Sequence, residues 1–177
     1  MDREERAIEQ AGRVGELLLE LGWTVSTAES CTGGLIGYLL TGISGSSHYY
    51  EGGVVSYSDR IKQELLNVST ETLIAHGAVS HAVAREMATG VRKVLGTHVG
   101  ISVTGIAGPT GGTEAKPVGT TFVGVSTPRG ERIDHYIWEQ DRQGNKWRSA
   151  EAALQMLQEE LVIALDQRGE APPNAAR

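Results

Sequence analysis

The stretch Thr27-Ala28-Glu29-Ser30-Cys31-Thr32-Gly33-Gly34 decides the fold, because it joins a strand-like segment to a helix-like one. Before it, apolar and polar residues alternate from residue 23 onward, which is typical of a β-strand. After it, apolar residues recur at the spacing of a helix, at Leu35, Ile36, Leu39 and Leu40. We therefore expect a strand, a tight glycine-rich turn and a helix, an arrangement that presents a nucleophile or binds an anion in α/β proteins. The same residues also fit an ordinary helix cap followed by turn glycines.

The rest of the chain predicts an alternation of helices and strands. Apolar periodicity and capping residues predict helices at about 4–21, 32–40 and 145–165, short ones after Ser58 or Asp59 and after Ser69, and a longer one after Ser80. Strands are expected at about 24–27, 49–57, 98–104, 118–126 and 132–138, the last two forming a hairpin. This order predicts a mixed, mostly parallel sheet between two helical layers, an α/β/α fold. We expect one domain over residues 1–168 and a frayed tail over residues 169–177.

Composition narrows the class of protein. A chain of 177 residues fits a single domain. The net charge of −6 argues against a nucleic-acid or membrane-surface partner. The amino-terminal residues lack the apolar stretch of a signal peptide, and the chain has no run long enough to span a bilayer, so we expect a cytoplasmic protein. The single cysteine, Cys31, excludes an internal disulfide and an all-thiolate metal site.

Several familiar catalytic patterns do not fit. Neither glycine-rich loop ends in Gly-Lys-Ser/Thr, and there is no Gly-x-Gly-x-x-Gly, so the usual nucleotide-binding loops are not predicted. Ser30 is followed three residues later by Gly33 rather than a lysine, and it lacks the Gly-x-Ser-x-Gly context of an α/β-hydrolase. The five histidines have no metal-ligand spacing, so no metal site and no cofactor are predicted.

These exclusions leave a lysine as the candidate base for a serine nucleophile. Lys62 follows a predicted strand and can reach the carboxyl end of the Ser30 strand. To act as a base at neutral pH its pKa must fall by about three units, on the order of 4 kcal/mol, through burial and polar neighbours. Tyr57 and Thr104, at predicted strand ends, are candidates to hold the amine. The alternative is that Lys62 is a solvated helix residue.

Three further features concern the choice of nucleophile and the binding of a substrate. Cys31 is a rival nucleophile, since a thiol at a helix start has a depressed pKa, or else it is a buried, inert side chain. The loop over residues 104–112 offers N–H groups for an anion, or is a plain turn. Arg142 and Lys146 predict a basic helix start suited to a phosphate, or are part of a solvated charge run.

A set of motifs in order carries a resemblance to a known family. They are residues 27–34, Gly45-Ser46-Ser47, Tyr57-Ser58 followed by Lys62, His76-Gly77-Ala78-Val79-Ser80, Thr104-Gly105-Ile106-Ala107-Gly108-Pro109 and Lys116-Pro117-Val118-Gly119-Thr120. With these motifs, which cover about residues 6–165, the chain resembles the CinA carboxy-terminal family. The resemblance implies a three-layer α/β/α fold and a homo-oligomer, a dimer or larger. It also implies an amidohydrolase that converts nicotinamide mononucleotide to nicotinic acid mononucleotide and ammonia, in pyridine-nucleotide recycling.

The resemblance places a Ser/Lys dyad on Ser30 and Lys62, with Tyr57 and Thr104 beside them, and so favours Ser30 over Cys31. The residues that we predict to bind the substrate are Cys31, Thr32, Gly33, Gly34, Gly105, Ala107, Gly108, Arg142 and Lys146. The chain departs from the family where Gly-Asp-Arg and a later Arg are usual, because it has Gln140 and Lys146 there. Lysine keeps the charge but loses the bidentate geometry of arginine.

Two other functions remain open at this point. A non-catalytic nucleotide-binding or regulatory module would use the same loops only to hold a phosphate. An amidase for some other small amide would use the same dyad with a different pocket. Release of ammonia separates the first from an enzyme, and a panel of substrates separates the second.

Overall fold

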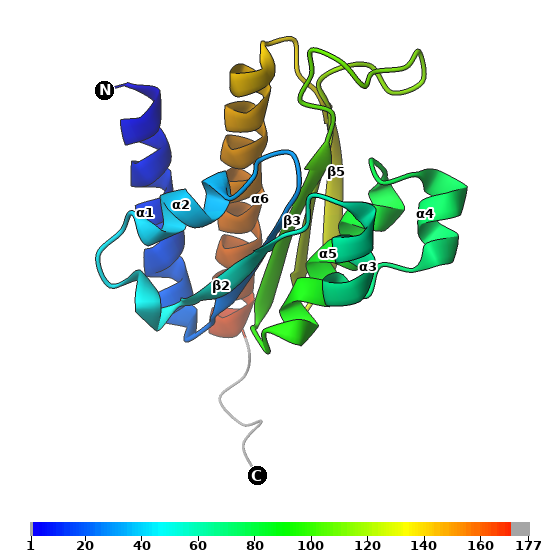
Figure 1. Cartoon of the computed structure of the whole chain (residues 1–177). Helices are drawn as coiled ribbons and strands as arrows, with labels where there is room; N and C mark the ends of the chain where they lie inside the picture. Colours follow the sequence, from blue (N-terminus) through cyan, green and yellow to red (C-terminus); the bar gives the residue numbers. More distant parts are fainter. Residues whose placement is uncertain (1, 171–177) are drawn as a thin grey trace.

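The computed structural model describes residues 2–170, which form a five-stranded sheet with helices on both faces (Figure 1). The helices are α1 (Arg3–Leu21), α2 (Leu35–Thr41), α3 (Asp59–Leu66), α4 (Thr70–His76), α5 (His81–Val94) and α6 (Arg142–Glu170), with a short 3₁₀ helix, η1 (Ser46–His48). The strands are β1 (Val25–Glu29), β2 (Tyr50–Val55), β3 (Val99–Gly105), β4 (Thr120–Thr127) and β5 (Gly130–Ile137). Within the described residues, no helix has the length and apolar character needed to cross a bilayer.

The sheet is mixed, as predicted, with the strand order β2-β1-β3-β4-β5. β1 pairs in parallel with β2 and β3, whereas the β3–β4 and β4–β5 pairings are antiparallel. The parallel and antiparallel pairings are therefore equal in number, although only β4 among the described strands runs against the others. At the last pair of the register, Glu29 lies beside Val55 and Val103, so β1, β2 and β3 end at one edge of the sheet. Ligand sites in such sheets lie at this carboxyl edge.

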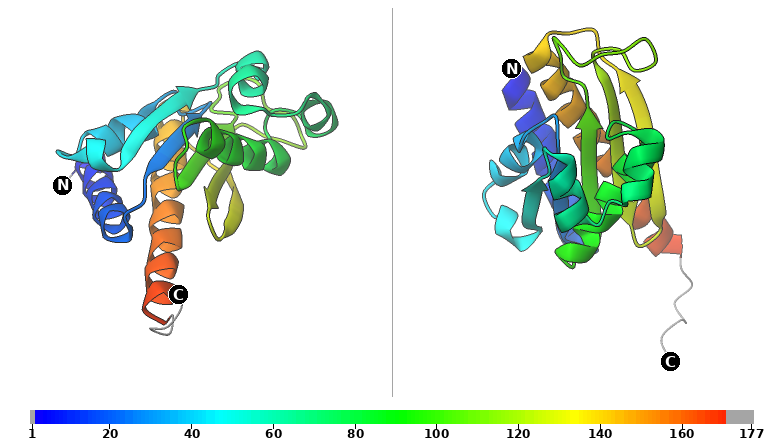
Figure 2. Two further views of the ribbon diagram at one scale, coloured as in Figure 1. Left: turned by 90° about the horizontal axis from the view of Figure 1, so that it is seen from below. Right: turned by 45° about the vertical axis from the view of Figure 1, so that its right-hand side comes forward.

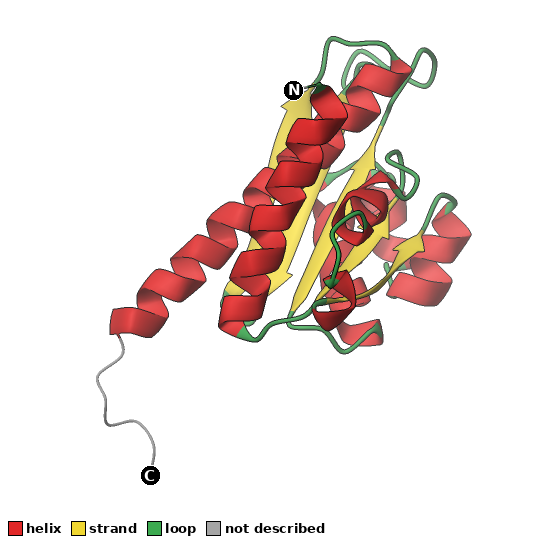
Figure 3. Ribbon diagram, turned by 90° about the vertical axis from the view of Figure 1, so that its left-hand side faces the viewer, coloured by secondary structure: helices red, strands yellow, loops and turns green. Residues whose placement is uncertain are grey.

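Helices cover the sheet in two layers, which confirms the α/β/α prediction. Helices α1, α2 and α6 lie on one face, where α1 and α6 run side by side (Figures 1 and 3). Helices α3, α4 and α5 lie on the other face, and the two rotated views show the same separation (Figure 2). The larger apolar core lies between the sheet and the α1/α6 layer and includes Leu18, Ile101 and Leu157. A smaller core, with Leu66 and Met87, lies under α3 and α5.

The helix boundaries follow from local chemistry. Ser58, Ser69 and Ser80 each accept a backbone N–H at the start of α3, α4 and α5, which confirms the predicted serine caps and selects Ser58 over Asp59. Helices α3 and α5 pack closely because Gly90 has no side chain, and a Cβ at that position would lie 2.0 Å from the carbonyl oxygen of Leu66.

Three helix boundaries differ from the prediction by three residues or more. Helix α2 begins at Leu35 rather than near residue 32, because Gly33 and Gly34 have φ of +66° and +101° and form a turn. Helix α6 begins at Arg142, three residues earlier than predicted. It also includes residues 169 and 170 of the predicted tail, and residues 171–177 of that tail lie outside the described residues.

Candidate active site

The parallel strands bring the predicted catalytic residues to one cavity of about 200 Å³. Ser30 follows β1, Tyr57 lies just beyond β2, and Gly105 ends β3. The cavity is lined by Ser30, Cys31, Tyr57, Asp59, Lys62, Ala78, Val79, Thr104, Gly105, Ala107 and Arg142. Eight of these residues were not adjacent in the sequence to Ser30 or Lys62, and the sheet topology is what gathers them.

Ser30 and Lys62 form a buried pair. The Nζ atom of Lys62 lies 3.3 Å from the Oγ atom of Ser30, and the two residues are 1% and 8% exposed, respectively. The amine also donates to the carbonyl oxygens of Ser56, at 2.9 Å, and Tyr57, at 3.4 Å. Burial lowers the pKa of Lys62 below its ordinary value, and the nearby carboxylate of Asp59 opposes that shift. Lys62 is therefore not a solvated helix residue.

Cys31 has the character of a core thiol rather than a nucleophile. It is buried, and burial raises the pKa of its thiol to about 12. Its sulfur lies against the end of β3, only 3.1 Å from where a Cβ on Gly105 would be. Because the thiolate is the reactive form, this environment leaves Cys31 protonated at neutral pH and favours Ser30 as the nucleophile.

Of the two residues predicted to hold the amine, Tyr57 does so through its backbone carbonyl oxygen, whereas the hydroxyl groups of Tyr57 and Thr104 have other hydrogen-bond partners. Thr104 Oγ1 donates to the carbonyl oxygen of Ala78, at 2.8 Å. The hydroxyl of Tyr57 accepts from Nη2 of Arg142, at 3.2 Å. The reason is topological: Lys62 lies on the first turns of the helix that follows β2, so its side chain folds back onto the carbonyl groups just before that helix.

The start of α2 already holds an anion, the carboxylate of Glu29. Glu29 is 1% exposed and accepts N–H groups from Gly34 at 3.0 Å, Ile36 at 3.1 Å and Gly37 at 2.9 Å. The N–H of Gly34 is therefore engaged within the protein, which corrects its predicted role as an anion donor. Sequence reasoning missed Glu29, although an acidic residue that ends a buried strand just before a helix start is a recognisable signal.

The turn after Ser30 has few remaining donors. The N–H of Ser30 donates to Val103 and that of Gly33 donates back to the carbonyl oxygen of Ser30. Thr32 is buried, and among the described residues its Oγ1 atom has no hydrogen-bond partner. The Nζ atom of Lys146 lies 3.7 Å from the position of a Cβ on Gly33, so its positive charge is close to this turn.

The loop after β3 is fastened to the start of α6. Arg142 donates from Nη1 to the carbonyl oxygen of Gly108, at 2.7 Å, and its other terminal nitrogen reaches Tyr57. Asn145, which the sequence analysis missed, is buried and donates to the carbonyl oxygen of Ala107, at 3.0 Å. These contacts place the guanidinium at the cavity wall. Within residues 2–170 no three His, Cys, Asp or Glu side chains cluster closely enough to hold a metal ion.

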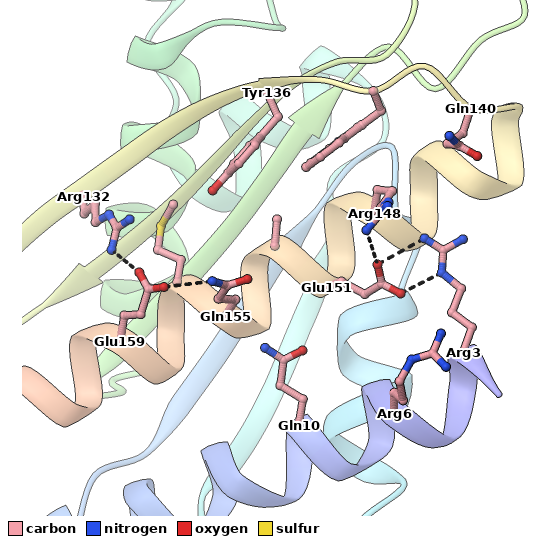
Figure 4. Close-up of a pocket in the computed structure, with 13 residues that line it drawn as sticks. Arg3, Arg6, Gln10, Arg132, Tyr136, Gln140, Arg148, Glu151, Gln155 and Glu159 are labelled. Atoms are coloured by element: carbon pink, nitrogen blue, oxygen red, sulfur yellow. Dashed lines mark hydrogen bonds and ion pairs between the residues drawn. The ribbon is translucent and has the colours of Figure 1, made fainter. Parts of the chain in front are cut away.

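A larger cavity, of about 730 Å³, lies elsewhere, between α1, β5 and α6 (Figure 4). Several of its charged side chains are paired with one another: Arg3 binds Glu151, and Arg132 binds Glu159 (Figure 4). It contains no serine, cysteine or lysine. The smaller cavity, with its buried hydroxyl and amine, is thus the better candidate for chemistry.

The fold and the cavity define an α/β protein with a buried serine–lysine pair at the carboxyl edge of its parallel strands. The family model of the CinA C-terminal domain matches residues 8–161, and the chain belongs to this family.

Relatives and solved structures agree with this assignment. A CinA-like protein of Synechococcus sp. is 50% identical over 155 residues, which is 86% of this chain but 37% of that protein. A CinA-like protein of Salinibacter ruber is 49% identical, over 85% of this chain and 36% of its own. The chain thus spans little more than a third of these relatives. The crystal structure of a CinA superfamily protein from Klebsiella pneumoniae superposes with a TM-score of 0.85 at 33% identity, covering 88% of this chain and 98% of that one. A competence/damage-inducible protein from Agrobacterium tumefaciens gives 0.81 at 39%, covering 90% and 95%.

Proposed function

We propose that this protein hydrolyses the carboxamide of nicotinamide mononucleotide, giving nicotinic acid mononucleotide and ammonia. The observation that carries the proposal is the 3.3 Å contact between Lys62 Nζ and Ser30 Oγ inside a cavity. Burial favours the neutral form of Lys62, which a general base requires. The resemblance to the CinA family supplies the choice of substrate.

The first half of the reaction forms an acyl-enzyme. Neutral Lys62 accepts the hydroxyl proton of Ser30 as Oγ attacks the carboxamide carbon and the carbonyl becomes an oxyanion. The backbone N–H groups of Cys31 and Thr32 are the proposed oxyanion donors, since those of Ser30, Gly33 and Gly34 are engaged within the protein. When the oxyanion collapses, the carbon–nitrogen bond breaks and the Lys62 ammonium gives its proton to the leaving amide nitrogen. Ammonia departs and the acyl group remains on Ser30.

The second half returns the enzyme to its starting state. The neutral amine of Lys62 accepts a proton from water as the water oxygen attacks the ester carbon. Collapse of that intermediate breaks the bond to Ser30 Oγ, and the ammonium reprotonates the serine. One water is consumed, and one carboxylic acid and one ammonia are formed.

Arg142 is the proposed partner of the substrate phosphate. Its guanidinium lines the same cavity as the dyad and is held in place by Gly108 and Tyr57. Lys146, on the next turn of α6, adds a second positive charge near Gly33. Because the dyad and the guanidinium line one cavity, the proposed substrate lies with its amide at Ser30 and its phosphate toward α6. Nicotinamide riboside, which lacks the phosphate, should then react more slowly.

The test is ammonia release from nicotinamide mononucleotide. The wild type and Lys93→Ala, which removes an exposed lysine of α5, should both release ammonia. Ser30→Ala and Lys62→Ala should lower the rate at least about a thousandfold while the fold, checked by circular dichroism, persists. A Lys62→Ala enzyme with full activity would refute the role of the dyad. A folded wild type that binds the mononucleotide without releasing ammonia would instead favour a nucleotide-binding module.

The family resemblance also leads us to propose a homo-oligomer, and the composition of the chain leads us to propose a cytoplasmic location. Light scattering of the purified chain tests the oligomeric state, and a monomer at the concentration of the ammonia assay would contradict it.

A further inference from the structure

Asp59 lies at the mouth of the cavity and faces the buried amine. It is the first residue of α3, and its Oδ1 atom lies 3.7 Å from Nζ of Lys62, one helical turn later. The Asp59 side chain is 60% exposed, whereas that of Lys62 is 2% exposed. The pair therefore joins a solvated carboxylate to an amine enclosed by protein. An acidic residue in the first turn of a helix also interacts favourably with the helix dipole. The side-chain cap of α3 is supplied by Ser58, however, so α3 does not need Asp59 as its cap.

The other polar groups around the cavity do not provide a negative charge for this amine. The thiol of Cys31 stays neutral because burial raises its pKa to about 12. The phenol of Tyr57 accepts a hydrogen bond from Arg142, whose own charge is positive. The carboxylate of Glu29 is occupied by the N–H groups of α2. Within the described part of the chain, Asp59 is the only carboxylate within 4 Å of Lys62 Nζ.

We propose that Asp59 is the counter-ion of Lys62, a positioning residue that stabilises the ammonium formed when Lys62 takes the proton of Ser30. The inference rests on the proposed function, because it assigns a role within the same reaction. An ammonium created in a closed cavity is costly unless a negative charge is near, and the exposed position of Asp59 lets it supply that charge while remaining solvated. The same carboxylate favours the protonated amine in the resting enzyme, so it opposes the effect of burial.

Removing the charge should therefore have two opposite effects. In Asp59→Asn more of the amine is neutral at a given pH, so the acidic limb of the kcat/KM profile should move to lower pH by about one unit, as expected for a partly solvated pair at this distance. At the pH optimum the base is weaker and its ammonium less stabilised, so kcat should fall about threefold to tenfold. A purely structural role for Asp59 predicts lower stability without movement of the limb.

The experiment compares the wild type, Asp59→Asn, Asp59→Glu and Glu64→Gln. Asp59→Glu keeps the charge and should keep the limb near its original pH. Glu64→Gln is the matched control, because it removes an exposed carboxylate of α3 that pairs with Arg60 rather than Lys62. The readouts are the pH profile of ammonia release and the NMR titration of the side-chain carbons of Lys62. The chain has only four lysines, at 62, 93, 116 and 146, so Lys62→Ala assigns that signal.

The outcomes separate the two proposals. A wild type that releases no ammonia defeats the proposed function, and the NMR titration still tests the counter-ion. A shift of the Lys62 titration to lower pH in Asp59→Asn, with Glu64→Gln unchanged, supports the pairing. An active wild type whose pH limb and Lys62 titration are both unchanged in Asp59→Asn overturns the role of Asp59 and leaves the dyad intact.

Discussion

Replacing Glu29 should destabilise the protein strongly, because its buried carboxylate accepts the backbone N–H groups at the start of α2. Three backbone N–H groups donate to it, at 2.9 to 3.1 Å, and the bond from Ile36 is buried. A hydrogen bond to a charged group contributes about 1.5–3 kcal/mol, so three of them set an upper limit of about 4.5–9 kcal/mol. The bonds from Gly34 and Gly37 are only partly buried, so in the variant water can accept hydrogen bonds from these two N–H groups and offset part of the loss. We therefore expect Glu29→Ala to cost about 3–5 kcal/mol.

Urea unfolding followed by circular dichroism measures this loss as a lower midpoint at unchanged slope. Glu29→Gln keeps the shape of the side chain but has one acceptor oxygen in place of two, so it should lose about half as much. Glu51→Ala, which removes an exposed carboxylate from β2, is the matched control and should stay within about 0.5 kcal/mol of the wild type. A Glu29→Ala protein that unfolds within about 1 kcal/mol of the wild type would show that the carboxylate does not hold the helix start.

Three other predictions concern packing and ionisation. Gly90→Ala should lower the free energy of unfolding in urea by at least about 2 kcal/mol, because the new Cβ would lie 2.0 Å from the carbonyl oxygen of Leu66. The control is Gly12→Ala in α1, whose Cβ would make only an ordinary 3.6 Å contact, so its stability should be unchanged or higher. Cys31 should resist maleimide in the native protein at pH 7 and react once urea unfolds it, and rapid native labelling would contradict its burial and raised pKa. The pKa of Lys62 is lower in the folded protein, so the unfolded chain binds the Lys62 proton more tightly than the folded protein does. The free energy of unfolding of the wild type, relative to that of Lys62→Met, should therefore rise as the pH increases from the folded pKa toward the ordinary value of about 10.5. A difference that does not change with pH would refute the lowered pKa.

Much of the fold could be predicted because local signals agree with tertiary packing. The helix at the amino terminus, the serine caps and the late hairpin are all encoded within a few residues of where they occur. The predicted start of α2 was wrong because a turn takes the place of its first residues. The stretch before Leu35 has glycines that adopt positive φ, and apolar spacing alone does not reveal this.

The sequence predicts which residues line the cavity but not which atoms they contact. The strand ends brought Ser30, Lys62, Tyr57 and Thr104 to one cavity, as expected of parallel strands. Which hydroxyl or carbonyl meets the amine depends on side-chain direction and on the path between β2 and α3, which spacing does not give. Asn145 and Glu29 were missed for the same reason. Asn145 binds the backbone of Ala107, which is distant in the sequence, and Glu29 binds backbone N–H groups at the start of the next helix, α2.

The antiparallel hairpin has a practical consequence for attaching probes. Its turn, with Pro128 and Arg129 exposed, lies at the opposite end of the sheet from Ser30, because Gly105 pairs with Thr121 at one end and Gly100 with Ser126 at the other. A fluorophore or surface tether joined through Arg129→Cys would sit far from the cavity mouth. The native thiol is enclosed and protonated, so conjugation at the hairpin should be selective without first removing Cys31.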